Sequence, residues 1–343
     1  MPAITLQQYD PDNRTLNELG DKERTDRAKD IDTRWRWYYG AHPDVLKVVQ
    51  GQVNDNVKLN LCGRGTDRLL EFIGHPTDLV VDTDAPDAED SASAEDDETV
   101  TPEQQVINDV YAVAIKPILP EMQLVTLVAG HSFIRVWVDE NGDIQAAGID
   151  PKAVSVYWNA GTGSQRQPLF YRIQWTDGDK AYRQDIVPRW LQSPDPQFDQ
   201  DSTWDVYEFE SKGAKWNLTG ETNLPETFCP VIELRNKVAP FEYYGQTQLS
   251  DDVCNLNNSV NFLSTNTARI IRYHAHPRTI GEGVDAAKVN VTSIEGFFTV
   301  PEGAKVYNLE MQSDLASSMA MLQQLKGEFF ATMRVTDVSS IKD

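Results

Sequence analysis

The chain has 343 residues, a formal net charge of −22 and 40% hydrophobic residues. This length allows two or three structural units, and the hydrophobic content excludes a wholly disordered chain. No run reaches the roughly 18 consecutive apolar residues of a membrane-spanning helix, and the acidic excess argues against non-specific binding to nucleic-acid phosphates.

The N-terminus, MPAITLQQYDPDNR, lacks the basic and apolar regions of a signal peptide, so we expect the chain to stay in the cytoplasm where it is made. Its three cysteines, Cys62, Cys229 and Cys254, are odd in number, far apart and in no metal-ligand spacing. We expect them to be reduced thiols.

The first part of the chain predicts helices separated by an acidic loop. A charged segment, 15–38, indicates a helix that ends near Gly40, and TDRLLEFI indicates a second helix over 66–73. Residues 82–104 are acidic and free of aromatic residues, which is typical of a solvated loop. The following EQQVINDVYAVAIKPIL predicts a helix up to Pro117.

Residues 123–216 carry the alternation typical of strands. FIRVWVDENGDIQAAGI contains Asn141 and Gly142, a strong signal for a β-hairpin. Further strands are predicted in AVSVYWN, PLFYRIQW, KAYRQDIV and TWDVYEFE. Short strands with local connections predict a small antiparallel β-unit.

A long helix is predicted over 246–274. Between Asp252 and Arg269 the chain has sixteen uncharged residues, five of them asparagine. The predicted apolar stripe contains Leu249, Val253, Leu256, Val260, Leu263 and Ile270, with Thr267 in its one gap. The opposite face is polar and carries Cys254, Asn258, Asn261, Thr265 and Ala268.

Residues 275–311 combine Pro and Gly with the short runs GFFTV and AKVYNLEM, which predicts a β-hairpin insert. Ser313 then caps a second helix within 312–335, with apolar residues on one side. The sequence therefore predicts two helices joined by a small β-containing insert.

Catalytic signatures are few. The sequence has no nucleophile elbow, zinc-protease motif, dinucleotide fingerprint or phosphate loop. His274 and His276 are close in sequence, but no third metal ligand is obvious nearby. We expect no enzymatic activity, no cofactor and no metal.

Three stretches resemble the portal proteins of tailed bacteriophages, the rings through which double-stranded DNA enters and leaves the capsid. The first is RWRWYYGAHPD followed by NVKLNLCGRGTDRLLEFIGHP, and the second is VAGHSFIRVWVDENGDIQAAGIDPKAVSVYWN. The third, CPVIELRNKVAPFEYYGQTQLS, leads into the predicted long helix. Their order and spacing along the chain carry the resemblance.

The resemblance implies an α+β chain with the portal fold: an α/β wing domain, long stem helices and a small β-containing clip. The wing would cover 1–245, the stem helices 246–274 and 312–335, and the clip 275–311. Residues 336–343 would begin the tunnel loop. Portals continue beyond this loop, so we expect the chain to be a truncated one.

The resemblance also implies a role in the virion, at the unique capsid vertex, after assembly in the host cytoplasm. The expected partners are identical subunits in a ring of about twelve, the terminase large subunit, a head-completion or adaptor protein, and the major capsid and scaffolding proteins. DNA would pass through the channel without sequence-specific contacts. The channel-facing candidates are Asn258, Asn261, Thr265, Asp337 and Lys342, and the candidates for binding partners at the clip are Arg278, Glu282, Phe297, Phe298 and Glu302.

Two alternatives stay open. One is a different ring-forming adaptor protein of the virion. The other is a β-rich cytosolic enzyme or binding protein, which would be a monomer or small oligomer with a deep pocket of convergent polar groups.

Overall fold

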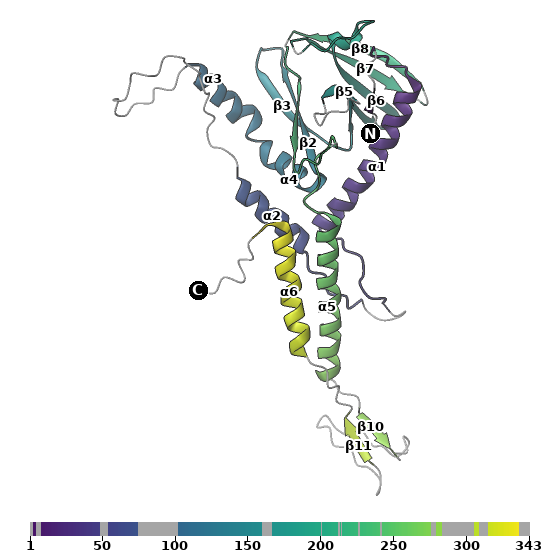
Figure 1. The fold of residues 1–343 in the computed structure, drawn as a ribbon, viewed down its shortest axis with the longest axis vertical. Coiled ribbons are helices and arrows are strands. Elements are labelled where there is room, and N and C mark those ends of the chain that lie inside the picture. The colour runs from purple at the N-terminus through teal and green to yellow at the C-terminus, as the bar shows by residue number, and fades with distance from the viewer. Residues whose placement is uncertain are drawn as a thin grey trace, which may run out of the picture. The chain divides into compact units, whose positions relative to one another are not determined.

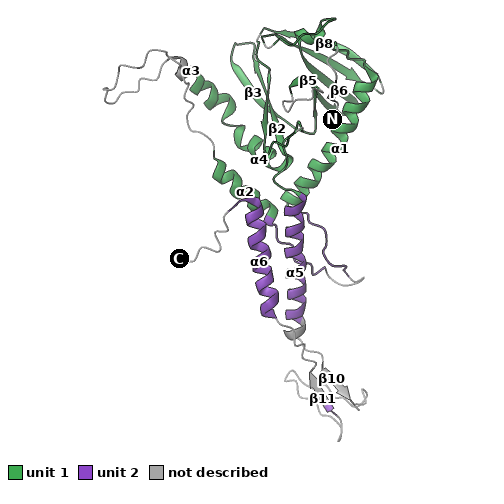
Figure 2. Ribbon diagram, viewed as in Figure 1, with its two compact units in different colours: residues 1–39, 62–250 green, residues 40–61, 251–343 purple. Residues whose placement is uncertain are grey.

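A computed structural model of the chain describes residues 3–4, 8–48, 54–74, 102–159, 167–199, 201–211, 213, 215–225, 227–240, 242–275, 279–282, 305–308 and 315–335. The fold is α+β, as predicted (Figure 1). Two compact units divide the chain: unit 1 contains residues 1–39 and 62–250, and unit 2 contains residues 40–61 and 251–343 (Figure 2). The predicted wing, 1–245, therefore differs from unit 1, because residues 40–61 belong with the long helix.

Helix α1 (Arg14–Tyr38) confirms the first predicted helix. Its N-cap, Asn13, accepts a hydrogen bond from the backbone N–H of Leu16 at 3.1 Å, which satisfies one of the free donors of the first turn. Tyr39 is the C-cap of the helix, and Gly40 follows it with a φ of +75°, which favours glycine.

The next helices differ from prediction at their ends. Helix α2 (Leu61–Ile73) begins before the predicted residue 66. Helix α3 (Pro102–Val110) continues through the π-turn η1 (Tyr111–Ile115), and α4 (Leu119–Ala129) follows. The predicted β-unit began at residue 123, but that residue is helical because a proline in the first turn of α4 starts a new helix instead of ending the helical region.

The strands of unit 1 form two sheets. The six-stranded sheet has the order β1-β4-β5-β6-β7-β8, with a parallel β1–β4 pair and antiparallel pairs elsewhere. The three-stranded sheet has the antiparallel order β3-β2-β9. Strand β8 begins at residue 216, the predicted end of the β-unit, and β9 lies beyond it. The strands are β1 (Ala3–Ile4), β2 (His131–Val138), β3 (Ile144–Ile149), β4 (Val154–Asn159), β5 (Pro168–Asp177), β6 (Lys180–Pro188), β7 (Trp204–Ser211), β8 (Trp216–Leu224) and β9 (Val231–Arg235).

Alternating side chains build the core of unit 1 in layers. Phe133 and Val156 share an apolar cluster with residues from both sheets, so the sheets pack face to face. Tyr157, on the opposite face of β4, belongs to a cluster that Leu16 of α1 covers. On the outer face of β2, Ile134 packs against α4 through Met122. The predicted hairpin between β2 and β3 is confirmed, with Gly142 at a φ of +87°.

Two glycines from separate stretches of the resemblance meet inside unit 1. A Cβ atom on Gly130 would lie 2.3 Å from the carbonyl oxygen of Gly245, and a Cβ atom on Gly245 would lie 2.3 Å from the carbonyl oxygen of Gly130. Beside them, Tyr244 stacks on the ring of His131 with centroids 4.4 Å apart. Only glycine permits this approach of two backbones.

A buried ion cluster lies on the α1 side of the six-stranded sheet. Asp185 is fully buried and accepts two hydrogen bonds of 2.8 Å from Arg172, and it also pairs with Arg183. The hydroxyl of Tyr9 donates to the same carboxylate at 2.7 Å. Burial alone would raise the pKa of Asp185, but the charges and hydrogen bonds of the two arginines lower it to about 2.

Unit 2 contains the predicted pair of helices, α5 (Asp251–Ala275) and α6 (Leu315–Met333), which pack against each other. Between them in sequence, β10 (Thr279–Glu282) and β11 (Lys305–Asn308) form an antiparallel pair. The acidic first turn of α5, with Asp251 and Asp252, suits the helix dipole. Strand β11 lies within the predicted run AKVYNLEM, but it pairs with β10; the other predicted run, GFFTV, lies outside the described residues.

Candidate functional site

The polar face of α5 carries the candidate site, and the structure covers much of that face with the chain itself. Residues 54–60 have no regular secondary structure, and they lie along α5 within unit 2. We call residues 54–60 the strap. Its backbone is held by side chains of α5, so the helix and the strap form one hydrogen-bonded structure.

Three neutral side chains hold the strap at regular intervals. Asn257 accepts from the N–H of Leu61, just after the strap, at 3.0 Å and donates to the carbonyl of Leu59 at 2.9 Å. Asn261 accepts from the N–H of Leu59 at 2.8 Å. One turn further on, the hydroxyl of Thr265 accepts from the N–H of Val57 at 3.0 Å.

The spacing of these contacts follows from helix and strand geometry. Four residues of an α-helix advance about 6 Å, and two residues of an extended chain advance about 6.6 Å. Side chains at i, i+4 and i+8 of α5 therefore meet every second residue of the strap, which runs in the opposite direction. Asparagine is a weak helix former, but the four-residue spacing of Asn257, Asn261 and Thr265 matches the strap.

An ion pair continues the same row. Arg269 donates to Asp55 at 2.6 Å and 3.1 Å, and Arg272 donates to the same carboxylate at 3.1 Å. The hydrogen bond from Arg269 lowers the pKa of Asp55. Along α5, the side chains that contact the strap are thus two amides, then a hydroxyl, and then the charged Arg269.

A second layer holds the strap from its other side. The side-chain amide of Asn56 accepts from the N–H of Leu46 at 2.9 Å and donates to the carbonyl of Leu46 at 3.0 Å. Lys58 donates to the carbonyl of His42 and pairs with Asp44, both at 2.9 Å. Residues 42–46 are thereby tied to α5 through the strap.

This arrangement corrects part of the expected channel face. Asn261 is 1% exposed and Thr265 is 0% exposed, because the strap covers both. The prediction that they form a free polar surface is therefore wrong. Asn258 is half-buried, and its Oδ1 atom is buried without a hydrogen-bond partner in the described part of the chain.

The uncharged face that remains open on α5 is a neighbouring stripe. Asn255, Ser259 and Phe262 are exposed, and Asn266 is half-buried. These four residues, which we call the open stripe, recur at spacings of four, three and four and so lie along one side of the helix. No signal in the sequence indicates that a distant segment covers the centre of the polar face.

The other predicted residues fall mostly outside the described residues. Asp337, Lys342, Arg278, Phe297, Phe298 and Glu302 all lie outside them. Glu282 is the last residue of β10, in register with Lys305 of β11. Their predicted roles stay predictions.

The described residues contain no group of three or more His, Cys, Asp or Glu side chains that is arranged to hold a metal ion. In the same part of the chain, no single helix has the length and apolar character to cross a membrane. One bent pair, Gln105–Ile115 and Leu119–Ala129, meets those criteria by length and composition alone.

Comparison with known proteins gives no assigned family. No protein-family model matches the sequence, and no curated protein matches it. Among solved structures, the chain is similar to a protein in the virion of a native gene transfer agent particle, with 9% identity and a TM-score of 0.39. That match covers 69% of this chain and 63% of the other.

A second similar chain comes from the neck of a native gene transfer agent particle, a structure computed with C12 symmetry, at 9% identity and a TM-score of 0.39. It covers 70% of this chain and 63% of the other, so this chain spans less than two thirds of the length of the proteins it resembles. These values are too low to assign a function.

Proposed function

We propose that this chain is a portal-type subunit of a phage-like virion, forming a ring at the unique capsid vertex through which double-stranded DNA is packaged and ejected. The same ring would dock the terminase and the head-completion or tail proteins. In this proposal the chain performs no catalysis, and the energy for packaging comes from the terminase.

One observation carries the proposal: the order of elements in the chain. A layered α+β unit precedes a 25-residue helix, α5, and a small antiparallel pair, β10–β11, separates α5 from the returning helix α6. This order agrees with the wing, stem and clip that the three sequence stretches imply. The meeting of Gly130 with Gly245 adds support, because it gives a physical reason for a glycine in two of those stretches.

The open stripe gives the proposal a specific channel surface. A ring of identical subunits cannot keep fixed contacts with the phosphates of a moving DNA helix, so a channel wall needs few cations. Asn255, Ser259 and Asn266 are uncharged and hydrate well, and they replace the buried Asn261 and Thr265 as candidates for that wall.

Exposed apolar side chains in unit 2 support assembly with further copies. Phe262 and Ile271 of α5 are 46% and 51% exposed, and Met319 and Met321 of α6 are 47% and 48% exposed. Apolar groups at such positions are covered when subunits associate. A closed ring would cover them through heterologous contacts, one side of a subunit against the other side of the next.

Native mass measurement and electron microscopy of the purified chain test the proposal. We expect a ring with a central hole and a mass of about twelve subunits. A compact monomer or dimer without a hole would contradict it. Binding of the ring to terminase at a single capsid vertex would distinguish a portal from another virion adaptor.

A packaging assay tests the channel surface separately. Replacing Asn255 and Ser259 together by Lys adds a collar of positive charge, and we expect slower or stalled DNA packaging because cations bind phosphate. The matched control replaces Asn217 and Asn223, two exposed residues of β8, by Lys. Equal packaging by both variants would exclude the open stripe from the channel wall.

A further inference from the structure

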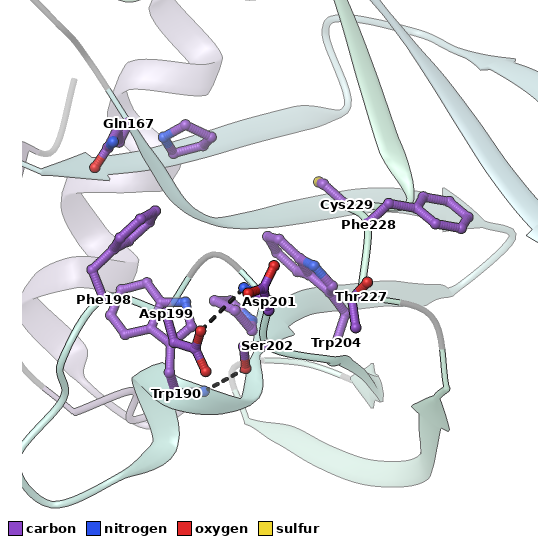
Figure 3. Close-up of a pocket in the computed structure, with 12 residues that line it drawn as sticks. Gln167, Trp190, Phe198, Asp199, Asp201, Ser202, Trp204, Thr227, Phe228 and Cys229 are labelled. Carbon is purple, nitrogen blue, oxygen red and sulfur yellow. Dashed lines mark hydrogen bonds between the residues drawn. The ribbon is translucent and has the colours of Figure 1, made fainter. Parts of the chain in front are cut away.

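A pocket of about 430 Å³ opens in unit 1 where several strand ends meet (Figure 3). It lies between the start of β5, the end of β6 and the start of β7, with residues 227–229 before β9 completing the wall. Its volume falls within the range of about 300–1,000 Å³ that is typical of ligand pockets. Neither the predicted channel nor the predicted clip includes this pocket.

The wall of this pocket is aromatic. Trp190 and Phe198 contact each other edge to face, with ring centroids 5.5 Å apart. Trp204 also lines the pocket, and Pro168 and Pro188 add apolar surface. Phe198 is 53% exposed, whereas other phenylalanines of unit 1, such as Phe133 and Phe209, are buried in the core. An exposed phenyl ring at the edge of an aromatic pocket is positioned to contact a ligand.

The charged groups of the pocket have one sign. Asp199 and Asp201 line it, and its described lining residues include no Lys, Arg or His. The Oδ1 atom of Asp199 accepts a hydrogen bond of 3.1 Å from the backbone N–H of Asp201. Within the described part of the chain, the carboxylate of Asp201 has no hydrogen bond or ion pair. Arg189, the arginine nearest in sequence to Asp199 and Asp201, pairs with Asp205 and not with them.

Another surface pocket of unit 1 has aromatic residues but a different balance of charges. That pocket, of about 450 Å³, contains Trp175 and Trp216, but it also contains Arg24 and Lys152 beside Asp150. Lys152 pairs with Asp150 and with Asp32. Its charges compensate one another, whereas the described lining residues of the aromatic pocket place no cationic side chain beside the carboxylates.

Aromatic faces and unpaired carboxylates together recognise a cation. The face of an indole or phenyl ring attracts a cation through its quadrupole, and a carboxylate forms short charge-assisted hydrogen bonds with guanidinium or ammonium groups. The net charge of −22 adds attraction at longer range. Anionic ligands such as phosphates are disfavoured by the same charges.

We propose that this pocket binds a cationic side chain of a partner polypeptide, with arginine preferred over lysine. A guanidinium stacks on aromatic rings and pairs with carboxylates through a fixed fork of donors, while an ammonium is a more strongly hydrated point charge. The pocket is therefore a docking point for an arginine-bearing segment. The proposal does not depend on assembly of the chain into a ring.

The test is a titration of the full chain with an acetylated and amidated glycine-arginine-glycine tripeptide, followed by tryptophan fluorescence or calorimetry. The comparison ligands are the lysine and glutamine versions of the tripeptide. Maltose, a neutral sugar, is included to detect binding to the aromatic wall without a positive charge. We expect saturable binding in the order arginine, lysine, glutamine. Equal binding of the glutamine tripeptide, binding of maltose alone, or no saturable binding of the arginine tripeptide would overturn the proposal.

Two pairs of variants separate a specific site from general charge attraction. Replacing Asp199 and Asp201 together by Asn should weaken arginine binding by about tenfold or more. The control, Asp177→Asn with Asp179→Asn, removes the same charge from the exposed end of β5 and the turn after it, and should leave binding unchanged. Equal weakening by both pairs would show attraction by net charge alone and would overturn the site.

The aromatic contact is tested in the same assay by Phe198→Ala, with Phe72→Ala as its control. Both phenyl rings are exposed, at 53% and 90%, so neither change should unfold the chain. We expect weaker binding of the arginine tripeptide with Phe198→Ala only. Unchanged binding by Phe198→Ala would remove the aromatic wall from the proposal and contradict it.

Discussion

The two units bury different kinds of side chain. In unit 1, two sheets and two helices enclose apolar side chains such as Phe133 and Ile186. In unit 2, helix α5 buries amide and hydroxyl groups on the face that the strap covers. Asn257, Asn261 and Thr265 are as deeply buried as the apolar core of the sheets. They are tolerated because nearly all their polar atoms bind the strap or its surroundings.

The two units therefore depend on different interactions. Apolar burial is non-directional and tolerates small shifts, but a row of hydrogen bonds fixes the register of the strap on α5. Unit 1 also contains a buried ion cluster around Asp185. The buried contacts between the strap and α5 are neutral. The predictions below, from the largest effect to the smallest, use this contrast.

The largest effect is expected from Asp185→Asn. This change leaves the buried guanidinium groups of Arg172 and Arg183 without their carboxylate. Breaking a buried ion pair in this way costs about 3–5 kcal/mol, so unit 1 should unfold at much lower denaturant. The control, Asp177→Asn at the exposed end of β5, should change stability by less than about 0.5 kcal/mol. Similar denaturation midpoints for the two variants would contradict the role of the cluster.

Acid should remove part of the same stabilisation. Because the folded pKa of Asp185 is about 2, below its ordinary value of 3.8, its contribution is complete above the ordinary value and is lost as the pH falls through the folded value. We expect the sheet signal in circular dichroism to weaken in that window. A directly titrated pKa of Asp185 at or above 4 would contradict this expectation. The neutral contacts of the strap should not titrate there.

A smaller effect is expected from Asn261→Ala in unit 2. The N–H of Leu59 loses its acceptor and the ring of His42 loses its contact with Asn261, and a buried unsatisfied group such as this N–H costs about 1–3 kcal/mol. Hydrogen exchange at Leu59 should accelerate while exchange in β5 and β6 stays unchanged. Ser259→Ala, an exposed change on the same helix, should leave both rates alone. Slow exchange at Leu59 in Asn261→Ala would show that the strap does not need the row of hydrogen bonds.

The smallest effect is expected from Arg269→Gln. Arg272 still pairs with Asp55 at 3.1 Å, and salt screens exposed pairs. Hydrogen exchange of the strap should rise slightly at low salt and match the wild type at high salt. Lys180→Gln, which removes an exposed pair with Glu210 in unit 1, should leave the strap unaffected. An effect as large as that of Asn261→Ala would mean that charge, and not the amide row, holds the strap.

Several elements could be predicted because their signals are local. The charged α1 with its stop at Gly40, the hairpin at Asn141 and Gly142, and the long helix α5 each follow from neighbouring residues. The start of α4 was less predictable, since Pro120 permits a helix start as readily as a helix end.

The sequence by itself determined that α5 is a helix with a long uncharged polar face, because periodicity and charge are properties of neighbouring residues. Only the tertiary structure decided which part of that face is open. The strap binds α5 from about 200 residues away in the chain, and backbone donors and acceptors leave no mark on residue identity. For the same reason Asp185 reads as an ordinary acid of an acidic chain until folding brings Arg172 and Tyr9 to its carboxylate.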